Sequence, residues 1–101
     1  MEINKKMNED VCEVDLIGRL DTTTAPELET TLKEVLDTDV KNLEINLDQL
    51  DYISSAGLRV LLFAQKSVNT VDGSMLIKNV KPEIMEVFEI TGFSDILTIE
   101  K

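Results

Sequence analysis

The side chains of greatest chemical use in this sequence are two adjacent serines, Ser54 and Ser55, which lie where an extended segment turns into a helix. Serine is among the best N-cap residues, so capping alone explains one of the two. Two small hydroxyl residues at such a junction stand out in a chain with few other reactive side chains. Gly57 follows in the first turn, where glycine costs up to about 1 kcal/mol relative to alanine. This glycine indicates that bare backbone is needed there, either for packing or for close approach of a partner.

The remaining inventory for catalysis is small. The chain has no histidine, no tryptophan and one cysteine among its 101 residues. Serine-histidine-aspartate and cysteine-histidine catalysis and the common zinc sets are therefore excluded. The phosphate-cradling run Gly-x-x-x-x-Gly-Lys-Ser/Thr is absent, and four glycines leave little room for another nucleotide loop. We expect neither enzymatic activity nor a cofactor.

Acidic residues dominate the charge. Twenty acidic residues against ten basic ones give a formal net charge of -10. A field of that sign repels nucleic-acid backbones and anionic lipid, so we expect no direct nucleic-acid binding and no membrane binding. It favours a partner with a basic docking surface. The row Glu83, Glu86 and Glu89 is interpreted as a solvated helix face. Asp48 and Asp51 could in principle hold a magnesium ion, although loop solvation or turn capping suits that pair better.

The cysteine and the hydrophobic pattern predict the compartment. Cys12 has no partner for an internal disulfide, which agrees with a reducing cytosol, and its strand-like surroundings predict a small buried hydrophobe. No apolar run approaches the roughly 18 residues of a membrane span. Residues 1–6 lack the apolar stretch of a signal peptide. We therefore expect a cytoplasmic protein.

Hydrophobic periodicity and helix signals give the expected elements. Strands are predicted at 2–6, 11–17 and 43–47 and around Met75 and Ile77, with a loop over 18–23 and either an edge strand or a packed tail at 96–99. Helices are predicted to begin at the capping-box pattern of Thr24 to Glu27, at the serine pair, and at Pro82. The second helix is predicted to end at Asp72-Gly73 and the third at Gly92. In the second helix, one stripe is expected to face the core; it consists of Leu58, Leu61, Leu62, Gln65 and Val68.

The order of these elements is strand, strand, helix, strand, helix, strand, helix. Strands that alternate with helices predict an α/β fold with a mixed sheet, parallel neighbours and right-handed crossovers. A chain of 101 residues favours one domain spanning 1–101, and a monomer is expected because the fold needs no partner to close its core.

At residues 50–62, Leu-Asp-Tyr-Ile-Ser-Ser-Ala-Gly-Leu-Arg-Val-Leu-Leu, the sequence resembles the phosphorylation-site signature of the anti-sigma factor antagonists in the STAS family. Residues 18–21 followed by Thr24-Ala25 resemble the family's loop before its first helix. Residues 87–93 with Ile96 resemble its C-terminal helix and cap. These segments span nearly the whole chain in the family's order. The resemblance implies a STAS-like domain with a mixed sheet of four to five strands and three to four helices.

The resemblance also implies a function. The unphosphorylated antagonist binds an anti-sigma factor that is also a serine kinase, which frees a sigma factor and permits transcription. The kinase phosphorylates the antagonist and releases it, and a serine phosphatase resets the switch. The implied acceptor is Ser55, two places before Gly57, with Ser54 as the alternative. The implied partner-binding residues are Asp21, Thr22, Thr23, Ser54, Ala56, Gly57, Leu58 and Arg59.

Two positions depart from the family pattern. Ser54 stands where some members have aspartate, and Ala56 stands where serine or threonine is frequent, which leaves the particular partner-switching pathway open. Two further interpretations remain. One is a STAS module of a stress-signalling complex or of cytoplasmic lipid-transport machinery. The other is a small nucleotide-binding protein or hydrolase, against which the missing phosphate loop and catalytic side chains count.

Overall fold

The computed structural model describes residues 1–100 and contains one mixed sheet with its helices. In chain order the elements are β1 (Glu2–Asn8), β2 (Val11–Leu20), α1 (Ala25–Leu36), β3 (Asn42–Ile53), α2 (Ser55–Thr70), β4 (Ser74–Lys78), α3 (Pro82–Thr91) and the short 3-10 helix η1 (Phe93–Asp95). The sheet has four strands in the order β1-β2-β3-β4. β1 runs antiparallel to β2, while β3 is parallel to both β2 and β4. The predicted α/β fold with a mixed sheet of four to five strands and three to four helices is confirmed.

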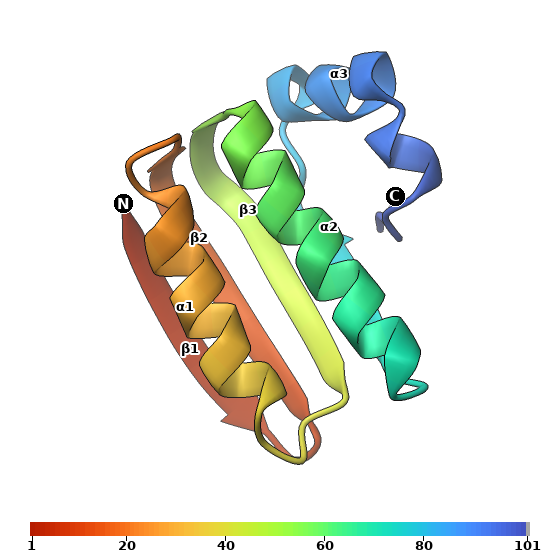
Figure 1. Cartoon of the computed structure of the whole chain (residues 1–101). Coiled ribbons are helices and arrows are strands. Elements are labelled where there is room, and N and C mark those ends of the chain that lie inside the picture. The colour runs from red at the N-terminus through yellow and green to blue at the C-terminus, as the bar shows by residue number, and fades with distance from the viewer. Residues whose placement is uncertain (101) are drawn as a thin grey trace.

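Helices α1 and α2 lie side by side across one face of the sheet, and α3 lies at the end of the sheet where β3 finishes (Figure 1). The face beneath the helices is apolar because alternate residues of each strand point the same way. Cys12, Val14 and Leu16 of β2 and Leu43, Ile45 and Leu47 of β3 are all buried there. Cys12 is thus a buried hydrophobe, as predicted.

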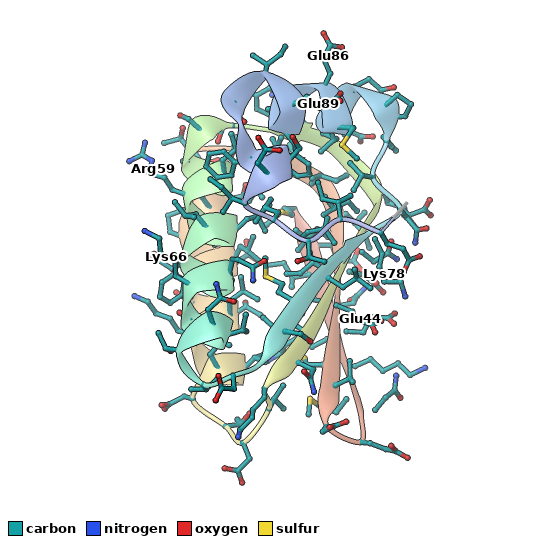
Figure 2. The ribbon with its side chains drawn as sticks, turned by 90° about the vertical axis from the view of Figure 1, so that its right-hand side faces the viewer. Glu44, Arg59, Lys66, Lys78, Glu86 and Glu89 are labelled. Carbon is teal, nitrogen blue, oxygen red and sulfur yellow. The ribbon has the colours of Figure 1, made fainter. Side chains whose placement is uncertain are left out.

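The opposite face of the sheet carries polar side chains. Glu13 of β2 stands directly beside Glu44 of β3, a like-charge pair that costs stability unless a cation balances it. Lys78 of β4 supplies that cation, with its Nζ 3.2 Å from Glu44 Oε1. The hydrogen bond to Glu44 raises the pKa of Lys78. Figure 2 shows Glu44 and Lys78 on the side of the sheet away from α2.

Two strands are longer than the sequence predicted. β2 continues to Leu20, through the expected loop at 18–23, and β3 continues to Ile53 rather than ending at 47. Their parallel pairing shifts register between Asp15 and Ile17 and again between Gly18 and Arg19. In β3 the buried positions then change from every second residue to Leu47, Leu50 and Ile53. A bulge breaks the period-2 pattern while the strands remain paired, so hydrophobic alternation alone ended both strands too early.

The aspartates considered for magnesium, Asp48 and Asp51, lie within β3 and are exposed, so neither is in a loop. Across residues 1–100, no group of three or more histidine, cysteine, aspartate or glutamate side chains could hold a metal ion. None of the helices among these residues is long and apolar enough to cross a membrane.

The C-terminal segment was predicted closely. α3 begins at Pro82 and ends at Thr91, and its C-cap is the predicted Gly92, whose φ of 82° places it in the left-handed region that suits glycine. The tail forms a single parallel bridge, Ile99 to Ile77 of β4, with Ile77 N–H donating to Thr98 O at 2.9 Å and Glu100 N–H donating to Ile77 O at 2.8 Å. Of the two alternatives for 96–99, the structure therefore has a packed tail held by one bridge.

One buried polar group lacks a partner within the described chain. Gln65 of α2 is only 7% exposed; its Nε2 donates to Asn69 Oδ1 at 3.1 Å, but its Oε1 accepts nothing. A buried acceptor without a donor costs about 1–3 kcal/mol.

We therefore predict that Gln65→Met raises the free energy of unfolding by about 1 kcal/mol, because methionine fills a similar volume without the unpaired oxygen. Urea denaturation of both proteins measures this directly. A loss of stability would instead show that the Gln65 amide has a favourable polar contact.

Candidate functional site

The N-terminus of α2 distinguishes the two serines. Ser54 is the N-cap, with extended backbone angles of φ -97° and ψ 173°, and its Oγ accepts from Gly57 N–H at 3.2 Å. Ser54 is half-buried, whereas Ser55, the first residue of the helix, is exposed. The prediction that one serine caps the helix is confirmed, and the cap is Ser54. The hydroxyl of Ser55 is the one that faces solvent.

A backbone hydrogen bond ties this helix start to the neighbouring strand. Ser54 N–H donates to Leu20 O at 2.9 Å, where the parallel pairing of β2 with β3 ends at Leu20 and Ile53. The chain leaves β2 immediately afterwards, at Asp21. The loop that follows β2 therefore starts beside the serine pair, although about thirty residues separate them in sequence.

Asp21 organises that loop. Its Oδ1 accepts from Thr23 N–H at 3.0 Å, from Thr23 Oγ1 at 2.7 Å and from Thr24 N–H at 3.1 Å. These hydrogen bonds, that of the Thr23 hydroxyl above all, lower the pKa of Asp21. Asp21 is thus ionised at neutral pH and holds Thr22 and Thr23, both exposed, in a defined turn.

The capping box predicted at Thr24 to Glu27 is wrong. Thr24 is the N-cap of α1, but its side chain makes no capping hydrogen bond. Its Oγ1 donates instead to Arg19 O at 2.8 Å and accepts from Asp21 N–H at 2.8 Å. The threonine therefore fastens the Asp21 turn to the end of β2 rather than capping the helix.

Gly57 is explained by packing. A Cβ at this position would lie 2.6 Å from Leu20 Cγ and 3.0 Å from Ile53 Cγ1, closer than atoms of a folded protein tolerate. The bare backbone lets α2 approach the ends of β2 and β3. Leu58, the next residue, is only 4% exposed. Of the predicted partner-binding residues, Gly57 and Leu58 thus lie in the core and position the helix rather than presenting a surface.

The other predicted site residues come together on the surface. Thr22 from the loop and Ala56 and Arg59 from α2 line a shallow hollow of about 350 Å³. Ser55 and Arg59 are exposed one helical turn apart, and Ala56 is half-buried between them. The structure therefore brings Asp21, Thr22, Thr23, Ser54, Ser55, Ala56 and Arg59 into one region that includes the loop after β2 and the first turn of α2.

Two further residues border this region and were not predicted as part of it. Arg19 Nε lies 3.9 Å from Asp21 Oδ2, and the Arg19 guanidinium stacks 4.3 Å from the centroid of the Tyr52 ring. Tyr52 is 41% exposed and is the only tyrosine in the chain. A lone tyrosine two places before the serine pair was the available signal, because exposed aromatic rings and arginines are enriched in interfaces.

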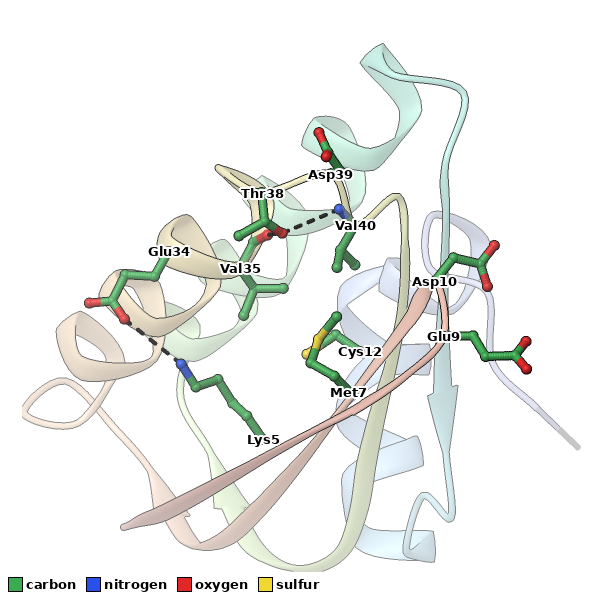
Figure 3. Close-up of a pocket in the computed structure, with 10 residues that line it drawn as sticks. All are labelled: Lys5, Met7, Glu9, Asp10, Cys12, Glu34, Val35, Thr38, Asp39 and Val40. Atoms are coloured by element: carbon green, nitrogen blue, oxygen red, sulfur yellow. Dashed lines mark hydrogen bonds and ion pairs between the residues drawn. The ribbon is translucent and has the colours of Figure 1, made fainter.

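A larger pocket of about 520 Å³ lies elsewhere, between the β1–β2 hairpin and the C-terminal end of α1 (Figure 3). Its apolar lining includes Met7, Cys12, Val35 and Val40, and Lys5 pairs with Glu34 at its rim at 3.8 Å. Burial raises the pKa of the Cys12 thiol, so this cysteine stays protonated and unreactive at neutral pH. The pocket lies at the C-terminal end of α1, away from the serine pair, and none of its lining residues belongs to the region around Ser55.

Comparison with known proteins now identifies the family. The family model described as STAS domain matches residues 2–101. The chain belongs to the STAS domain family.

The similar proteins narrow the group within it. BtrV of Bordetella bronchiseptica, described as an anti-sigma factor antagonist, is 39% identical over 84 residues, which cover 83% of this chain and 72% of BtrV. The anti-sigma-B factor antagonist of Staphylococcus aureus is 33% identical over 89 residues, covering 88% of this chain and 82% of that protein. The chain thus falls among the anti-sigma factor antagonists of the family.

Solved structures share the fold. The anti-sigma factor antagonist SpoIIAA of Bacillus matches in its unphosphorylated form with a TM-score of 0.80, at 18% identity, over 99% of this chain and 88% of SpoIIAA. Its phosphorylated form matches with a TM-score of 0.78, also at 18% identity, over 99% of this chain and 92% of that one.

The tight approach at Gly57 gives a prediction about stability. Gly57→Ala should lower the free energy of unfolding by about 1–2 kcal/mol, because overpacking costs about 1–3 kcal/mol and the better helix propensity of alanine returns up to about 1 kcal/mol. Urea denaturation measures the change. In a double-mutant cycle, Leu20→Ala should relieve part of this cost, since the added methyl would then have room. Additive effects of the two substitutions would contradict the packing explanation.

The hydrogen bonds of Asp21 predict a pH dependence. Because its pKa is lower in the folded protein than in the unfolded chain, Asp21 stabilises the fold above the unfolded value of about 3.9, and this contribution is lost as pH falls through the folded value. Asp21→Ala should therefore be less stable than wild type at pH 7, and the two melting temperatures should converge below about pH 4. A difference that stays constant from pH 7 to pH 2.5 would show that the charge of Asp21 plays no part.

Proposed function

We propose that this protein is a phosphorylation-controlled partner switch: it binds an anti-sigma factor that is also a serine kinase, and phosphorylation of Ser55 releases it. In this cycle the kinase transfers the γ-phosphoryl group of ATP to Ser55 Oγ, the hydroxyl proton leaves, and ADP is released. A serine phosphatase hydrolyses the phosphate with water and restores the binding form. The protein itself acts by binding and not as a catalyst, and it works in the cytoplasm as a monomer.

The observation that carries this proposal is the division of labour between the serines. Ser55 is exposed at the first position of α2, while the Ser54 hydroxyl accepts from Gly57 N–H. A kinase can reach the Ser55 hydroxyl without disturbing the helix, whereas a phosphate on Ser54 would remove the N-cap hydrogen bond. Loss of such a cap costs about 0.5–2 kcal/mol. Ser55 is therefore the proposed acceptor and Ser54 the alternative.

The fold tolerates a phosphate at Ser55. The first-turn amides of a helix have no carbonyl partner within it, and here those of Gly57 and Leu58 are already taken by Ser54. The amides of Ser55 and Ala56, together with the dipole of a sixteen-residue helix, favour a dianion at this point. SpoIIAA has been solved in an unphosphorylated and a phosphorylated form, and this chain matches both folds with similar TM-scores. Phosphorylation in this protein thus acts on the interface rather than on the fold.

The proposed interface combines the Asp21 loop with the start of α2. Thr22, Thr23, Ser55 and Arg59 are exposed, with Ala56 half-exposed between them, and Asp21 fixes the loop from inside. A partner seated there covers the Ser55 hydroxyl. A phosphate adds about -1.5 to -2 charge that must then be desolvated against a surface shaped for a neutral group. Unpaired or like-charge contacts of this kind cost several kcal/mol, and about 3–4 kcal/mol lowers affinity several-hundredfold.

The test uses the candidate anti-sigma factor kinase and ATP. We expect one added phosphate by intact-mass spectrometry, located on Ser55 by peptide sequencing and abolished in Ser55→Ala. Ser54→Ala is the matched control, and it should still be phosphorylated while losing about 1 kcal/mol of stability with the cap.

Binding provides the second measurement. Calorimetry without ATP hydrolysis measures binding to the kinase. We expect Ser55→Ala to bind the kinase like wild type, and we expect the purified phosphoprotein to bind the kinase at least a hundredfold more weakly. A phosphate on Ser54 would move the site by one residue. If an active kinase that binds the protein leaves it unmodified, the switch mechanism is wrong, and a STAS module of a larger signalling or transport complex becomes the better interpretation.

A further inference from the structure

Helix α2 differs in charge from the rest of the molecule. Its sixteen residues, Ser-Ala-Gly-Leu-Arg-Val-Leu-Leu-Phe-Ala-Gln-Lys-Ser-Val-Asn-Thr, include no aspartate or glutamate, although acidic residues make up 20 of the 101 in the chain. Its two charged residues, Arg59 and Lys66, are both cations and both exposed. They project from α2 on the side away from the sheet (Figure 2). The outer face of α2 is thus a local positive strip on a protein of net charge -10.

Apolar side chains lie between these cations. Leu62 and Phe63 are only half-buried, and they occupy the turn between Arg59 and Lys66. Lys33 of α1 reaches across to the same place, with its Nζ 5.6 Å from the centroid of the Phe63 ring. The same Nζ lies 3.8 Å from Glu29 Oε2 one turn back on α1, so the charge of Lys33 already has a partner, and Arg59 and Lys66 carry the positive charge of this surface.

A shallow hollow lies on each side of Phe63. One, of about 460 Å³, is bordered by Arg59, Leu62 and Lys66. The other, of about 540 Å³, is bordered by Lys33, Leu36 and Val71 and by the acidic residues Glu34 and Asp37. Val71, just beyond the helix, is 46% exposed. We call the residues Lys33, Arg59, Leu62, Phe63, Lys66 and Val71 the α2 ridge. Its apolar side chains lie between the cations Arg59 and Lys66 on one side of Phe63 and beside Glu34 and Asp37 on the other, so the positive part of the ridge is the hollow at Arg59 and Lys66.

We propose that the α2 ridge is a second docking surface, which binds an acidic amphipathic segment of the same partner protein that covers Ser55. This inference rests on the proposed function. Ser55, Arg59, Leu62, Phe63 and Lys66 lie on one helix of about 24 Å, so a single partner can contact both Ser55 and the ridge. Carboxylates of the partner pair with Arg59 and Lys66, while its apolar side chains enter the hollow beside Phe63 that these two cations border.

Charge and shape favour a short protein segment over other anions. A nucleic acid or an anionic membrane extends beyond the strip and meets the acidic remainder of the surface, which repels it. A second copy of this chain is the nearest competitor, since α3 presents Glu86 and Glu89 beside Ile90, which is 76% exposed. Only a segment belonging to the partner is continuous with the Ser55 surface.

The test compares charge reversals at two exposed lysines. Lys66→Glu changes the ridge, and Lys6→Glu makes the same change in net charge on β1, away from α2. We expect Lys66→Glu to weaken binding of the unphosphorylated protein to the anti-sigma factor kinase about tenfold, mainly through slower association, and Lys6→Glu to change it less than twofold. Phe63→Ala should lower the affinity for the kinase about tenfold as well, in this case through faster dissociation. Melting temperatures verify that each variant is folded.

Two measurements make the outcomes decisive. Backbone NMR of the labelled protein with unlabelled kinase should show perturbed amides from Ser55 through Thr70. The ridge proposal is wrong if the perturbed amides stop at the first turn, or if Lys66→Glu binds the kinase as well as Lys6→Glu does. The proposed function still stands in either case if phosphorylation of Ser55 releases the kinase. If phosphorylation releases nothing, the proposed function fails independently. Sedimentation that shows concentration-dependent self-association abolished by Lys66→Glu would assign the ridge to a second copy and overturn the proposal.

Discussion

The contact of α2 with the ends of β2 and β3 is the constraint on which the rest of the site depends. Gly57 has no Cβ because Leu20 and Ile53 occupy that space, and Ser54 N–H donates to Leu20 O at 2.9 Å beside it. These two contacts fix where the helix starts and which way its first turn faces. They also place the loop of Asp21 beside the serine pair. The surface at Ser55 is therefore a product of core packing and not of a flexible loop.

The same arrangement separates the residue that caps α2 from the exposed serine beside it. Ser54 caps the helix with its hydroxyl, and the adjacent Ser55 is left exposed at the point where helix amides accept negative charge. The Asp21 carboxylate accepts hydrogen bonds from Thr23 and Thr24 within its own turn. The Ser54 hydroxyl and the Asp21 carboxylate thus have their partners within the chain, so the loop and the helix start form a preformed surface, and binding to such a surface costs little ordering entropy.

Much of the fold could be predicted from sequence because short-range rules governed it. Alternation located the strands, Pro82 and Gly92 delimited α3, and the serine pair marked the start of α2. The ends of β2 and β3 could not be predicted, since the register shifts after Asp15 and Gly18 disrupt the alternation on which a strand assignment depends.

Features that depend on contacts between distant segments could not be predicted from the sequence either. The role of Thr24 is set by Arg19 O and the Asp21 turn, which the local capping pattern concealed. Gly57 was recognised as unusual, but only the structure shows that Leu20 and Ile53 require it. The site residues Thr22 and Arg59 could be grouped by family resemblance, whereas the hollow that joins them is a property of the packed helices.

The bridge between Ile99 and Ile77 has a consequence for association in the cell. β4 lies at one margin of the sheet, and the tail already uses the N–H and C=O groups of Ile77 there. At the other margin β1 carries Lys5 and Lys6, whose charges oppose the addition of a foreign strand. The sheet thereby resists edge-to-edge aggregation at both margins. The folded protein can thus reach high concentration without its strands pairing with those of another copy.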